Sequence, residues 1–184
     1  MNMSNRQNFI FHKTKIDGVI IVETKLFGDN RGYFMETYQQ IDFVEGGIES
    51  VFIQDNQSRS SKNVLRGLHF QKNYPQAKLV RVISGQVFDV CVDLRKESSS
   101  YGQWIGEILS AENGKQLFVP RRFAHGFLVL SDSAEFIYKC DNYYQPEDEG
   151  GIIWNDPTIN IKWPLTGEPI LSEKDLKWTY LDDK

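Results

Sequence analysis

The residues best suited to chemistry gather around His69. It ends the run Val-Leu-Arg-Gly-Leu-His, which also carries Arg66, and the next apolar run opens with Lys78 and contains Arg81. Residues three apart on a regular strand point to opposite faces, but Gly67 permits a bulge that would turn Arg66 and His69 into one pocket. Because a neutral histidine is a base matched to neutral pH, this segment is a candidate catalytic strand, although most lone strand histidines are structural.

Two further histidines complete the set. His12 lies in a polar N-terminal segment, and we expect it on the surface. His125 stands in a turn before an apolar strand and could be a metal ligand. A metal-binding barrel needs three or four closely spaced ligands, such as His-x-His with a later Glu, whereas His69 is followed by Phe70 and Gln71. We therefore expect no metal, and a positioning or hydrogen-bonding role for His125. No glycine loop for a nucleotide cofactor is present.

The elements that must position these residues are short strands. Runs rich in Val, Ile, Phe and Tyr are separated by Gly and Asn/Asp turn signals, which favours an all-β sandwich or barrel. The turns are expected at 29–30, 46–47, 84–85, 113–114 and 150–151. Phe88, Val90, Val92 and Leu94 alternate with Asp89, Cys91 and Asp93, so one face is plain core and the other resembles the lining of a ligand-holding barrel. The expected strands are 19–27, 33–38, 51–57, 64–70, 78–83, 87–94, 104–109, 116–119, 127–130, 135–141 and 152–154.

Helical signals are few. Residues 38–45 favour a short helix, and Ser172 to Asp175 read as a capping box that opens a final turn. That cap is a sufficient structural role for Asp175. By pattern alone Tyr138 is an aromatic core residue, and Tyr143, Tyr144 and Trp154 are core or stacking surfaces. Glu36 and Glu149 by themselves are solvated charges.

Composition limits the function classes. The chain has 184 residues, 40% hydrophobic and 25% charged, which predicts a single globular domain over residues 1–184. The 21 Lys and Arg against 25 Asp and Glu give a net charge of −4, which disfavours nucleic-acid binding. No apolar run is long enough for a membrane span, and residues 1–15 lack a signal peptide, so we expect a cytoplasmic protein. Cys91 and Cys140 read as buried free thiols.

Taken in order, several segments form a specific pattern. They are 27–36 (FGDNRGYFME), 52–58 (FIQDNQS), 63–71 (NVLRGLHFQ), 78–82 (KLVRV), 85–95 (GQVFDVCVDLR), 123–127 (FAHGF), 138–140 (YKC) and 171–175 (LSEKD). From about residue 18 to 175 the chain closely resembles the dTDP-4-dehydrorhamnose 3,5-epimerase family. Each motif alone would be weak, but all of them in sequence order are highly specific.

The resemblance implies a cupin-type jelly roll (double-stranded β-helix) with a few short helices, without metal or cofactor, assembled as a homodimer. The implied reaction is epimerisation of dTDP-4-dehydro-6-deoxy-D-glucose to dTDP-4-dehydro-L-rhamnose in dTDP-L-rhamnose biosynthesis. In the implied catalytic set His69 is the base, Asp175 its carboxylate partner, Lys78 the cation at the sugar ketone and Tyr138 the proton donor. Further implied contacts to the dTDP-sugar are Arg66, His125, Gln54, Asn56, Glu149 and Lys174, with Arg31 and Glu36 supplied by an exchanged N-terminal strand of the partner subunit.

Two segments depart from the family. Arg121-Arg122 stands where an acidic residue and a glycine are more usual, and the tail after Asp175 lacks the common small residues and proline. The alternatives left open are a single-carbon epimerase acting on a related 4-keto nucleotide sugar, a metal-dependent cupin, and a catalytically silent sugar-nucleotide binding module. The missing second histidine argues against the metal-dependent cupin, and the intact set His69, Lys78, Tyr138 and Asp175 argues against the silent module.

Overall fold

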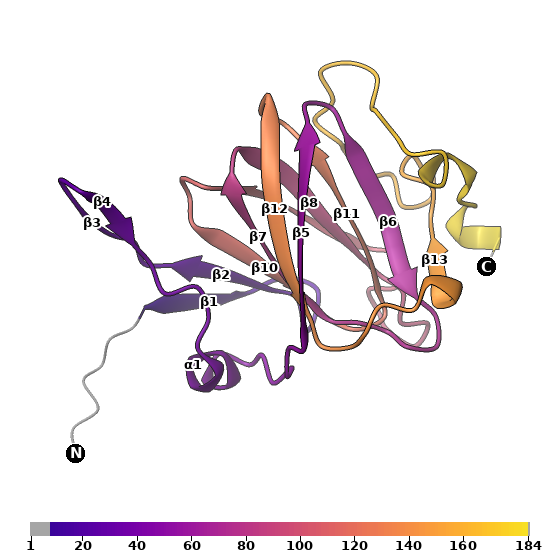
Figure 1. Ribbon diagram of the computed structural model, residues 1–184. Helices are drawn as coiled ribbons and strands as arrows, with labels where there is room; N and C mark the ends of the chain where they lie inside the picture. Colours follow the sequence, from indigo (N-terminus) through magenta and orange to yellow (C-terminus); the bar gives the residue numbers. More distant parts are fainter. Residues whose placement is uncertain (1–7, 184) are drawn as a thin grey trace.

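Two antiparallel sheets face each other in the computed structural model, which describes residues 8–183 (Figure 1). One short α-helix and three 3-10 turns complete the chain within that range. The strands are β1 (Phe9–Lys13), β2 (Ile20–Thr24), β3 (Phe27–Asp29), β4 (Gly32–Phe34), β5 (Gln54–Ser61), β6 (Leu65–Gln71), β7 (Lys78–Ser84), β8 (Gln86–Asp93), β9 (Trp104–Ser110), β10 (Lys115–Val119), β11 (Phe123–Val129), β12 (Ser133–Cys140) and β13 (Glu149–Gly151). The helix is α1 (Gln40–Glu45), and the turns are η1 (Pro146–Asp148), η2 (Asp175–Lys177) and η3 (Leu181–Asp183).

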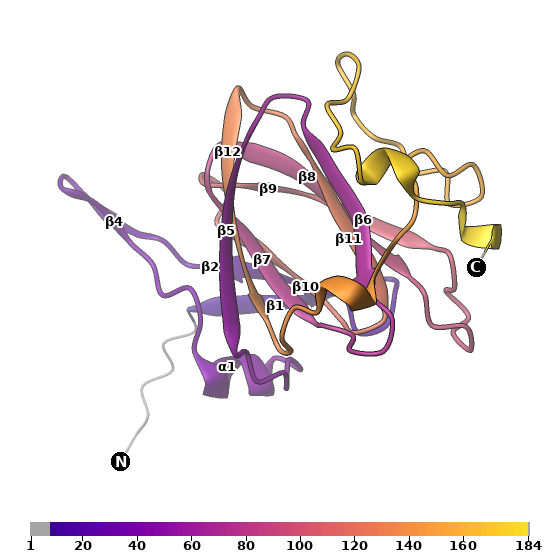
Figure 2. The same ribbon diagram turned by 45° about the vertical axis from the view of Figure 1, so that its right-hand side comes forward.

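The strand order is that of a jelly roll. The six-stranded sheet has the order β1-β2-β10-β7-β12-β5, and the five-stranded sheet has the order β13-β6-β11-β8-β9. Chain neighbours such as β5 and β6, or β7 and β8, lie in different sheets, so the chain repeatedly crosses from one sheet to the other (Figure 2). This confirms the all-β, cupin-type jelly roll expected from the sequence.

The main core fills the space between the sheets. Phe127 of β11 and Phe136 of β12 stack across it with ring centroids 4.3 Å apart, an arrangement that adds to the burial of both rings. Val80, Cys91 and Leu117 belong to the same cluster. Cys91 and Cys140 are both free and buried, as predicted.

The outer face of the five-stranded sheet is also buried. Val90 and Val92 pack there against Ile152 and Leu181 of the C-terminal segment, which runs beside β6 and β13 in Figure 1. The predicted alternation along β8 is therefore confirmed. Its apolar residues face this second cluster, while Asp89 and Cys91 face the space between the sheets.

Several predicted boundaries were wrong. A strand, β1, lies within the segment read as merely polar; it pairs with β2, and His12 on it is surface-exposed and 3.4 Å from Glu23. The predicted strand 152–154 is replaced by β13, which contains both glycines of the expected turn at 150–151. Gly151 lies against the Trp178 ring, where a Cβ atom would come within 2.2 Å of it. The glycine therefore serves close packing rather than a turn.

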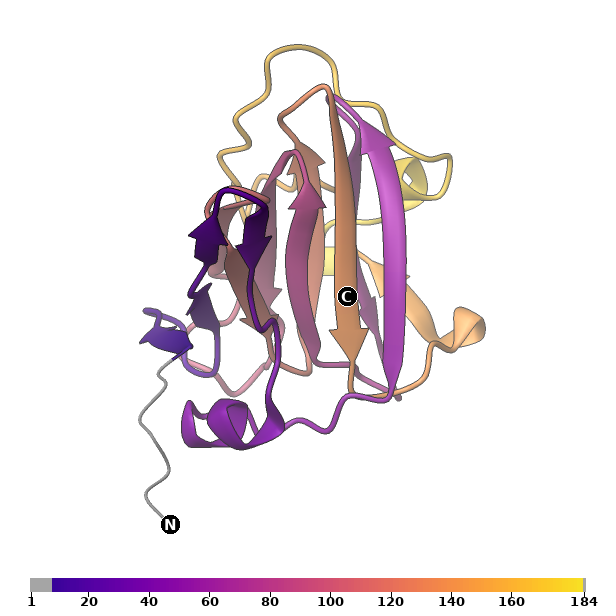
Figure 3. The ribbon, with the colours of Figure 1, turned by 60° about the vertical axis from the view of Figure 1, so that its left-hand side comes forward.

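The two-stranded hairpin β3–β4 extends away from both sheets (Figures 1 and 2), and in Figure 3 it lies in front of the six-stranded sheet. Its tip is the predicted turn after Asp29, and its side chains Tyr33 and Phe34 are 59% and 69% exposed. Within residues 8–183 no helix is long and apolar enough to cross a membrane.

Candidate active site

The candidate site lies between the sheets, at the end where β6 and β7 are joined. A cavity of about 290 Å³ opens there. The five-stranded sheet contributes His69, Phe70 and Glu149, and the six-stranded sheet contributes Lys78 and Tyr138, among others. The remaining lining residues are Gln54, Asn56, Gln76, Cys140 and Tyr144. Six of the predicted site residues, Gln54, Asn56, His69, Lys78, Tyr138 and Glu149, are thus brought to one cavity from segments far apart in the chain.

A bulge in β6 sets the direction of His69 and Arg66. His69 pairs with His125 and Arg66 pairs with Phe127, so three residues of β6 span only two of β11. Gly67 lies at this irregularity with φ +112°, and a Cβ atom on it would come within 2.6 Å of the β11 backbone. The bulge predicted from Gly67 is confirmed, and glycine is required there because the two backbones approach closely.

His69 is held by Asp175. Nε2 of His69 lies 2.5 Å from Oδ1 of Asp175, which is buried, and Nε1 of Trp178 donates to the same oxygen at 3.3 Å. Burial raises the pKa of Asp175, but the hydrogen bonds from His69, Ser172 and Trp178 outweigh it, so the pKa lies below its ordinary value. An ionised carboxylate only accepts hydrogen bonds, so Nε2 carries the proton and Nδ1 is the basic nitrogen.

The cap predicted at Ser172 is formed in part. The hydroxyl oxygen of Ser172 accepts a hydrogen bond from the backbone N–H of Asp175 at 3.1 Å. The Asp175 carboxylate, however, points to His69 rather than back to the start of the turn, and the ordered turn η2 is only three residues long. The capping role therefore does not account for the Asp175 side chain.

Glu149 links three groups at the rim of the cavity. One carboxylate oxygen accepts from Nζ of Lys174 and, at 2.6 Å, from the hydroxyl of Tyr144; the other lies 3.8 Å from Nδ1 of His69. Burial raises the pKa of Glu149, but these partners lower it below its ordinary value. Donation to Glu149 raises the pKa of Tyr144 to about 12. Glu149 is therefore no solvated charge, and Tyr144 is a rim residue rather than core.

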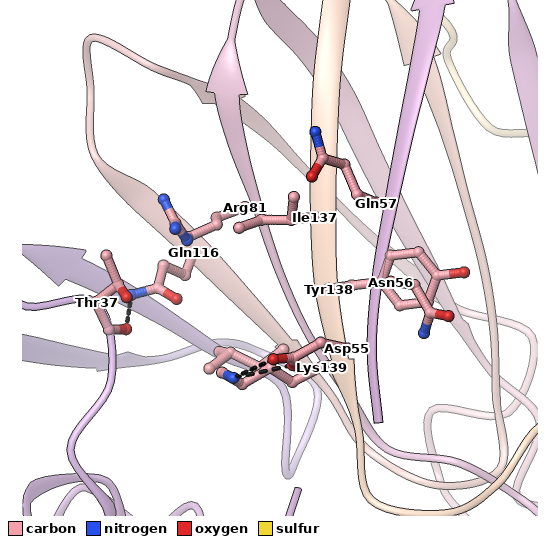
Figure 4. A pocket seen from close by; sticks show the side chains of 10 residues that line it. Thr37, Asp55, Asn56, Gln57, Arg81, Gln116, Ile137, Tyr138 and Lys139 are labelled. Carbon is pink, nitrogen blue, oxygen red and sulfur yellow. Dashed lines mark hydrogen bonds and ion pairs between the residues drawn. The ribbon is translucent and has the colours of Figure 1, made fainter. Parts of the chain in front are cut away.

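Lys78 and Tyr138 lie across the cavity from His69. Burial lowers the pKa of Lys78, while electrostatic interactions with Cys140, Asp89 and Glu149 act in the opposite direction. Burial also raises the pKa of Tyr138, so its hydroxyl stays protonated at neutral pH. Figure 4 shows Tyr138 and Asn56 on one side of β12 and Arg81 on the other, so Tyr138 faces the space between the sheets. The site thus offers a base on one sheet and a weak acid on the other.

A second hollow of about 360 Å³ adjoins the first on the other side of the His69–Asp175 pair. Arg66 and Lys174 both line it, together with Ser172. The Arg66 guanidinium donates from Nε to the Ser60 hydroxyl at 3.0 Å. Arg66 is an exposed residue of this second hollow. Two cations beside the base form a suitable surface for an anionic group such as a diphosphate.

Three predicted site residues line neither the main cavity nor the second hollow. His125 is buried next to His69, and its Nε2 lies 3.0 Å from both carboxylate oxygens of Asp89. Arg31 is at the tip of the protruding hairpin, where it pairs with Asp29 at 2.5 Å. Glu36 accepts a hydrogen bond from Asn8 at 2.7 Å in the segment that leads from that hairpin to α1. A single chain therefore does not bring Arg31 and Glu36 to the base.

Sequence reasoning missed Asp89 as a site residue and left Tyr144 as a stacking surface. The alternation along β8 placed Asp89 on the correct face, but nothing in the pattern revealed its histidine partner on β11. Within residues 8–183 no group of three or more His, Cys, Asp or Glu side chains is placed to hold a metal ion.

A jelly roll whose cavity holds a histidine–carboxylate base, a lysine and a facing tyrosine defines an acid–base isomerase that acts on carbon. The chain belongs to the dTDP-4-dehydrorhamnose 3,5-epimerase family, whose sequence model matches residues 13–183.

Known members are similar over nearly the whole chain. The enzyme of this description from Methanothermobacter thermautotrophicus is 55% identical over 172 residues, which cover 92% of this chain and 93% of that protein. The Salmonella typhimurium enzyme is 56% identical over 172 residues, covering 92% and 94%. The crystal structure of the Legionella pneumophila epimerase in complex with dTDP-4-keto-L-rhamnose superimposes with a TM-score of 0.92 at 49% identity, covering 95% of this chain and 93% of that one. The chain is therefore an isomerase of the carbohydrate epimerase class.

Proposed function

We propose that this chain converts dTDP-4-dehydro-6-deoxy-D-glucose to dTDP-4-dehydro-L-rhamnose by inverting C3 and C5, without a cofactor, in dTDP-L-rhamnose biosynthesis. The observation that carries the proposal is the placement of His69 and Tyr138 on opposite sheets of one cavity, with Lys78 on the same sheet as Tyr138. Inversion at carbon needs a base on one face and an acid on the other. The family membership and the similarity to the Legionella pneumophila complex support the same reaction.

The proposed first step is proton removal. Nδ1 of His69 takes the hydrogen from the carbon next to the C4 ketone, and the C–H electron pair moves toward the ketone oxygen as an enolate forms. The Asp175 carboxylate keeps Nε2 protonated and stabilises the imidazolium, and a positioned base of this kind contributes roughly 10²–10⁴ in rate. The Lys78 ammonium stabilises the enolate oxygen; loss of one such donor typically costs roughly 3–4 kcal/mol.

The second step returns a proton from the other side. The Tyr138 hydroxyl donates to the same carbon on the face opposite His69, and the enolate becomes the ketone again. The phenolate is then reprotonated from solvent, and the His69 imidazolium releases its proton to solvent. The same sequence at the second carbon completes the 3,5-epimerisation. Arg66 and Lys174 in the adjoining hollow would bind the diphosphate, while Gln54, Asn56 and Glu149 would contact the sugar. His125, which is buried next to His69, would have a positioning role.

The proposal includes a homodimer with an exchanged N-terminal strand. The hairpin β3–β4 projects from its own subunit with exposed Tyr33 and Phe34, and it carries Arg31 away from that subunit's cavity. The outer face of the six-stranded sheet has a hollow of about 400 Å³, lined by Arg81, Ile137 and others, that a second copy could cover (Figure 4). Arg31 and Glu36 would then reach the partner's site. A cytoplasmic location stays a prediction.

Proton NMR of the purified protein with dTDP-4-keto-6-deoxyglucose in D2O tests the reaction. We expect deuterium at both C3 and C5 and accumulation of the inverted sugar. Inversion at a single carbon would establish the single-carbon epimerase instead, and binding without exchange would establish the silent module.

Coexpression of Arg31→Ala and His69→Ala subunits tests the exchange. Each homodimer should be nearly inactive, but a heterodimer has one site with both an intact His69 and the partner's intact Arg31. Random pairing should restore roughly a quarter of the wild-type sites. The matched control pairs His69→Ala with Lys78→Ala, both within one cavity, and should restore nothing. Failure of the first pair to exceed this control would show that Arg31 does not act across subunits.

A further inference from the structure

Asp89 is a buried carboxylate to which the proposed steps give no role. It stands in the middle of β8, its side chain faces the space between the sheets, and its exposure is 0%. Both of its oxygens lie 3.0 Å from Nε2 of His125, the only side-chain hydrogen-bond partner of Asp89 within residues 8–183. Carboxylates are rarely buried without a reason, because desolvation of the charge is costly.

The His125–Asp89 pair lies beside the catalytic pair. His125 on β11 is directly opposite His69 on β6 in the strand register, and its ring stacks on Phe136 of the facing sheet. Both histidines present Nε2 to an aspartate. The difference is depth, since the His125 side chain is 8% exposed and that of His69 is 28% exposed. The site therefore has a second, deeper histidine–aspartate pair.

Lys78 places a cation close to this pair. Within residues 8–183 it forms no direct ion pair, so charges at longer range decide how well its ammonium is stabilised. The negative or titratable groups acting on it are Cys140 on β12, Asp89 on β8 and Glu149 on β13, and His69, Tyr138 and Tyr144 line the same cavity. Glu149 is already bound to Lys174. Asp89 has no lysine or arginine partner in the described chain, so its charge is available to Lys78.

We propose that Asp89 is a positioning residue of the active site, which holds His125 with Nε2–H toward itself and supplies the buried negative charge that keeps Lys78 in place as an ammonium. The inference rests on the proposed epimerisation, in which Lys78 stabilises the enolate. Burial raises the pKa of Asp89, and the charges of His125 and Lys78 act against that rise, so the carboxylate and the two bases stabilise one another.

Asp89→Asn tests the charge while keeping the shape. We expect kcat to fall roughly 10–100-fold, as for carboxylates that orient histidines at other sites, with KM for the nucleotide sugar nearly unchanged. The alkaline limb of the kcat–pH profile should move to lower pH, because the Lys78 ammonium loses a nearby negative charge.

Asp93→Asn is the matched control. Asp93 is also fully buried and lies four residues further along β8, but its carboxylate accepts from Arg95, Ser98 and Ser100, away from the cavity. This variant should lower the unfolding midpoint without moving kcat, KM or the pH profile. An Asp89→Asn protein that behaves in the same way would reduce Asp89 to a structural residue and overturn the inference.

NMR provides a readout that does not depend on turnover. In ¹⁵N-histidine spectra of the wild type, His125 should carry its proton on Nε2, and in Asp89→Asn the other tautomer should appear because an amide can also donate. The ¹³C-lysine titration of Lys78, assigned with Lys78→Arg, should shift to lower pH in Asp89→Asn and not in Asp93→Asn. A wild-type His125 protonated on Nδ1 alone would overturn the inference even if no variant folds. An inactive wild type with these NMR shifts would refute the proposed reaction and retain the positioning of Lys78.

Discussion

Oδ1 of Asp175 lies 2.5 Å from Nε2 of His69, although 106 residues separate them in the chain. The contact decides which ring nitrogen can act as a base, because the carboxylate accepts a hydrogen bond from Nε2–H and leaves Nδ1 without a proton. Asp175 is in turn held by Trp178 and by the turn that begins at Ser172. The C-terminal segment therefore determines the chemistry of a strand near the middle of the chain.

Asp175→Asn should keep the fold and lose activity. An amide can either donate to Nε2 or accept from it, so the tautomer of His69 is no longer enforced, and kcat should fall roughly 10²–10⁴-fold. The measurement is steady-state epimerisation beside a thermal unfolding curve. Asp182→Asn is the control, since this exposed residue of the same tail accepts a hydrogen bond from the Thr158 hydroxyl and lies outside both cavities. Equal losses in the two variants would indicate a general effect of the tail.

Prolonged chelation should leave epimerisation unchanged. Proton removal by His69 and enolate stabilisation by Lys78 together supply the chemistry that a metal would supply in a metal-dependent cupin. The measurement is the rate after dialysis against EDTA, with a zinc-dependent enzyme treated in parallel. If chelation lowered the rate and added metal ions restored it, the protein would be a metal-dependent cupin.

Asp93 should contribute to stability in a pH-dependent way. Burial alone would raise its pKa, but hydrogen bonds from Arg95, Ser98 and Ser100 outweigh it and lower the pKa to about 2. An unfolded aspartate titrates near about pH 3.9, so the contribution is complete above about pH 4 and disappears as the pH falls toward the folded value. The difference in unfolding free energy between the wild type and Asp93→Asn, measured by urea denaturation, should therefore shrink below about pH 4. A difference independent of pH would contradict this assignment.

Arg122→Gly should stabilise the protein. Arg122 adopts φ +66° in the turn before β11, at the position where the family more usually has glycine. A left-handed conformation costs a non-glycine residue roughly 1–2 kcal/mol, and the flexibility of glycine in the unfolded chain offsets part of that, so we expect a gain of about 0.5–1 kcal/mol. Asn160→Gly, at φ +52°, should gain less because asparagine tolerates this region. The measurement is the free energy of unfolding in urea. If the two variants gain equally, or if Arg122→Gly loses stability, the Arg122 backbone is not strained.

The sequence was sufficient for the fold class and for most of the cavity. Alternation along β8 placed Asp89 and Cys91 toward the interior, and Gly67 predicted the bulge that relates Arg66 to His69. Both are local signals, readable from a few neighbouring residues. The same kind of reading failed at 150–151, where glycines that resemble a turn belong to β13 because Trp178, far along the chain, packs against them.

Long-range partners account for the rest. The resemblance, not the pattern, paired Asp175 with His69, and local reasoning alone gave Asp175 only a cap. Nothing in the sequence linked Asp89 to His125, because that contact depends on the register between β8 and β11. The roles expected for Arg31 and Glu36 depend on a second subunit and stay predictions.

The central claim is that His69 and Tyr138 act on opposite faces of the sugar, and Tyr138→Phe tests it most directly. The ring is kept and only the hydroxyl is lost, so a packing role predicts little change. If Tyr138 is the proton donor, His69 still removes the proton, Lys78 still holds the enolate, and deuterium from D2O returns on the His69 side with retention. NMR should then show exchange exceeding inversion by roughly 10²–10⁴-fold. An unchanged ratio of exchange to inversion in a fully folded Tyr138→Phe protein would contradict the two-faced mechanism.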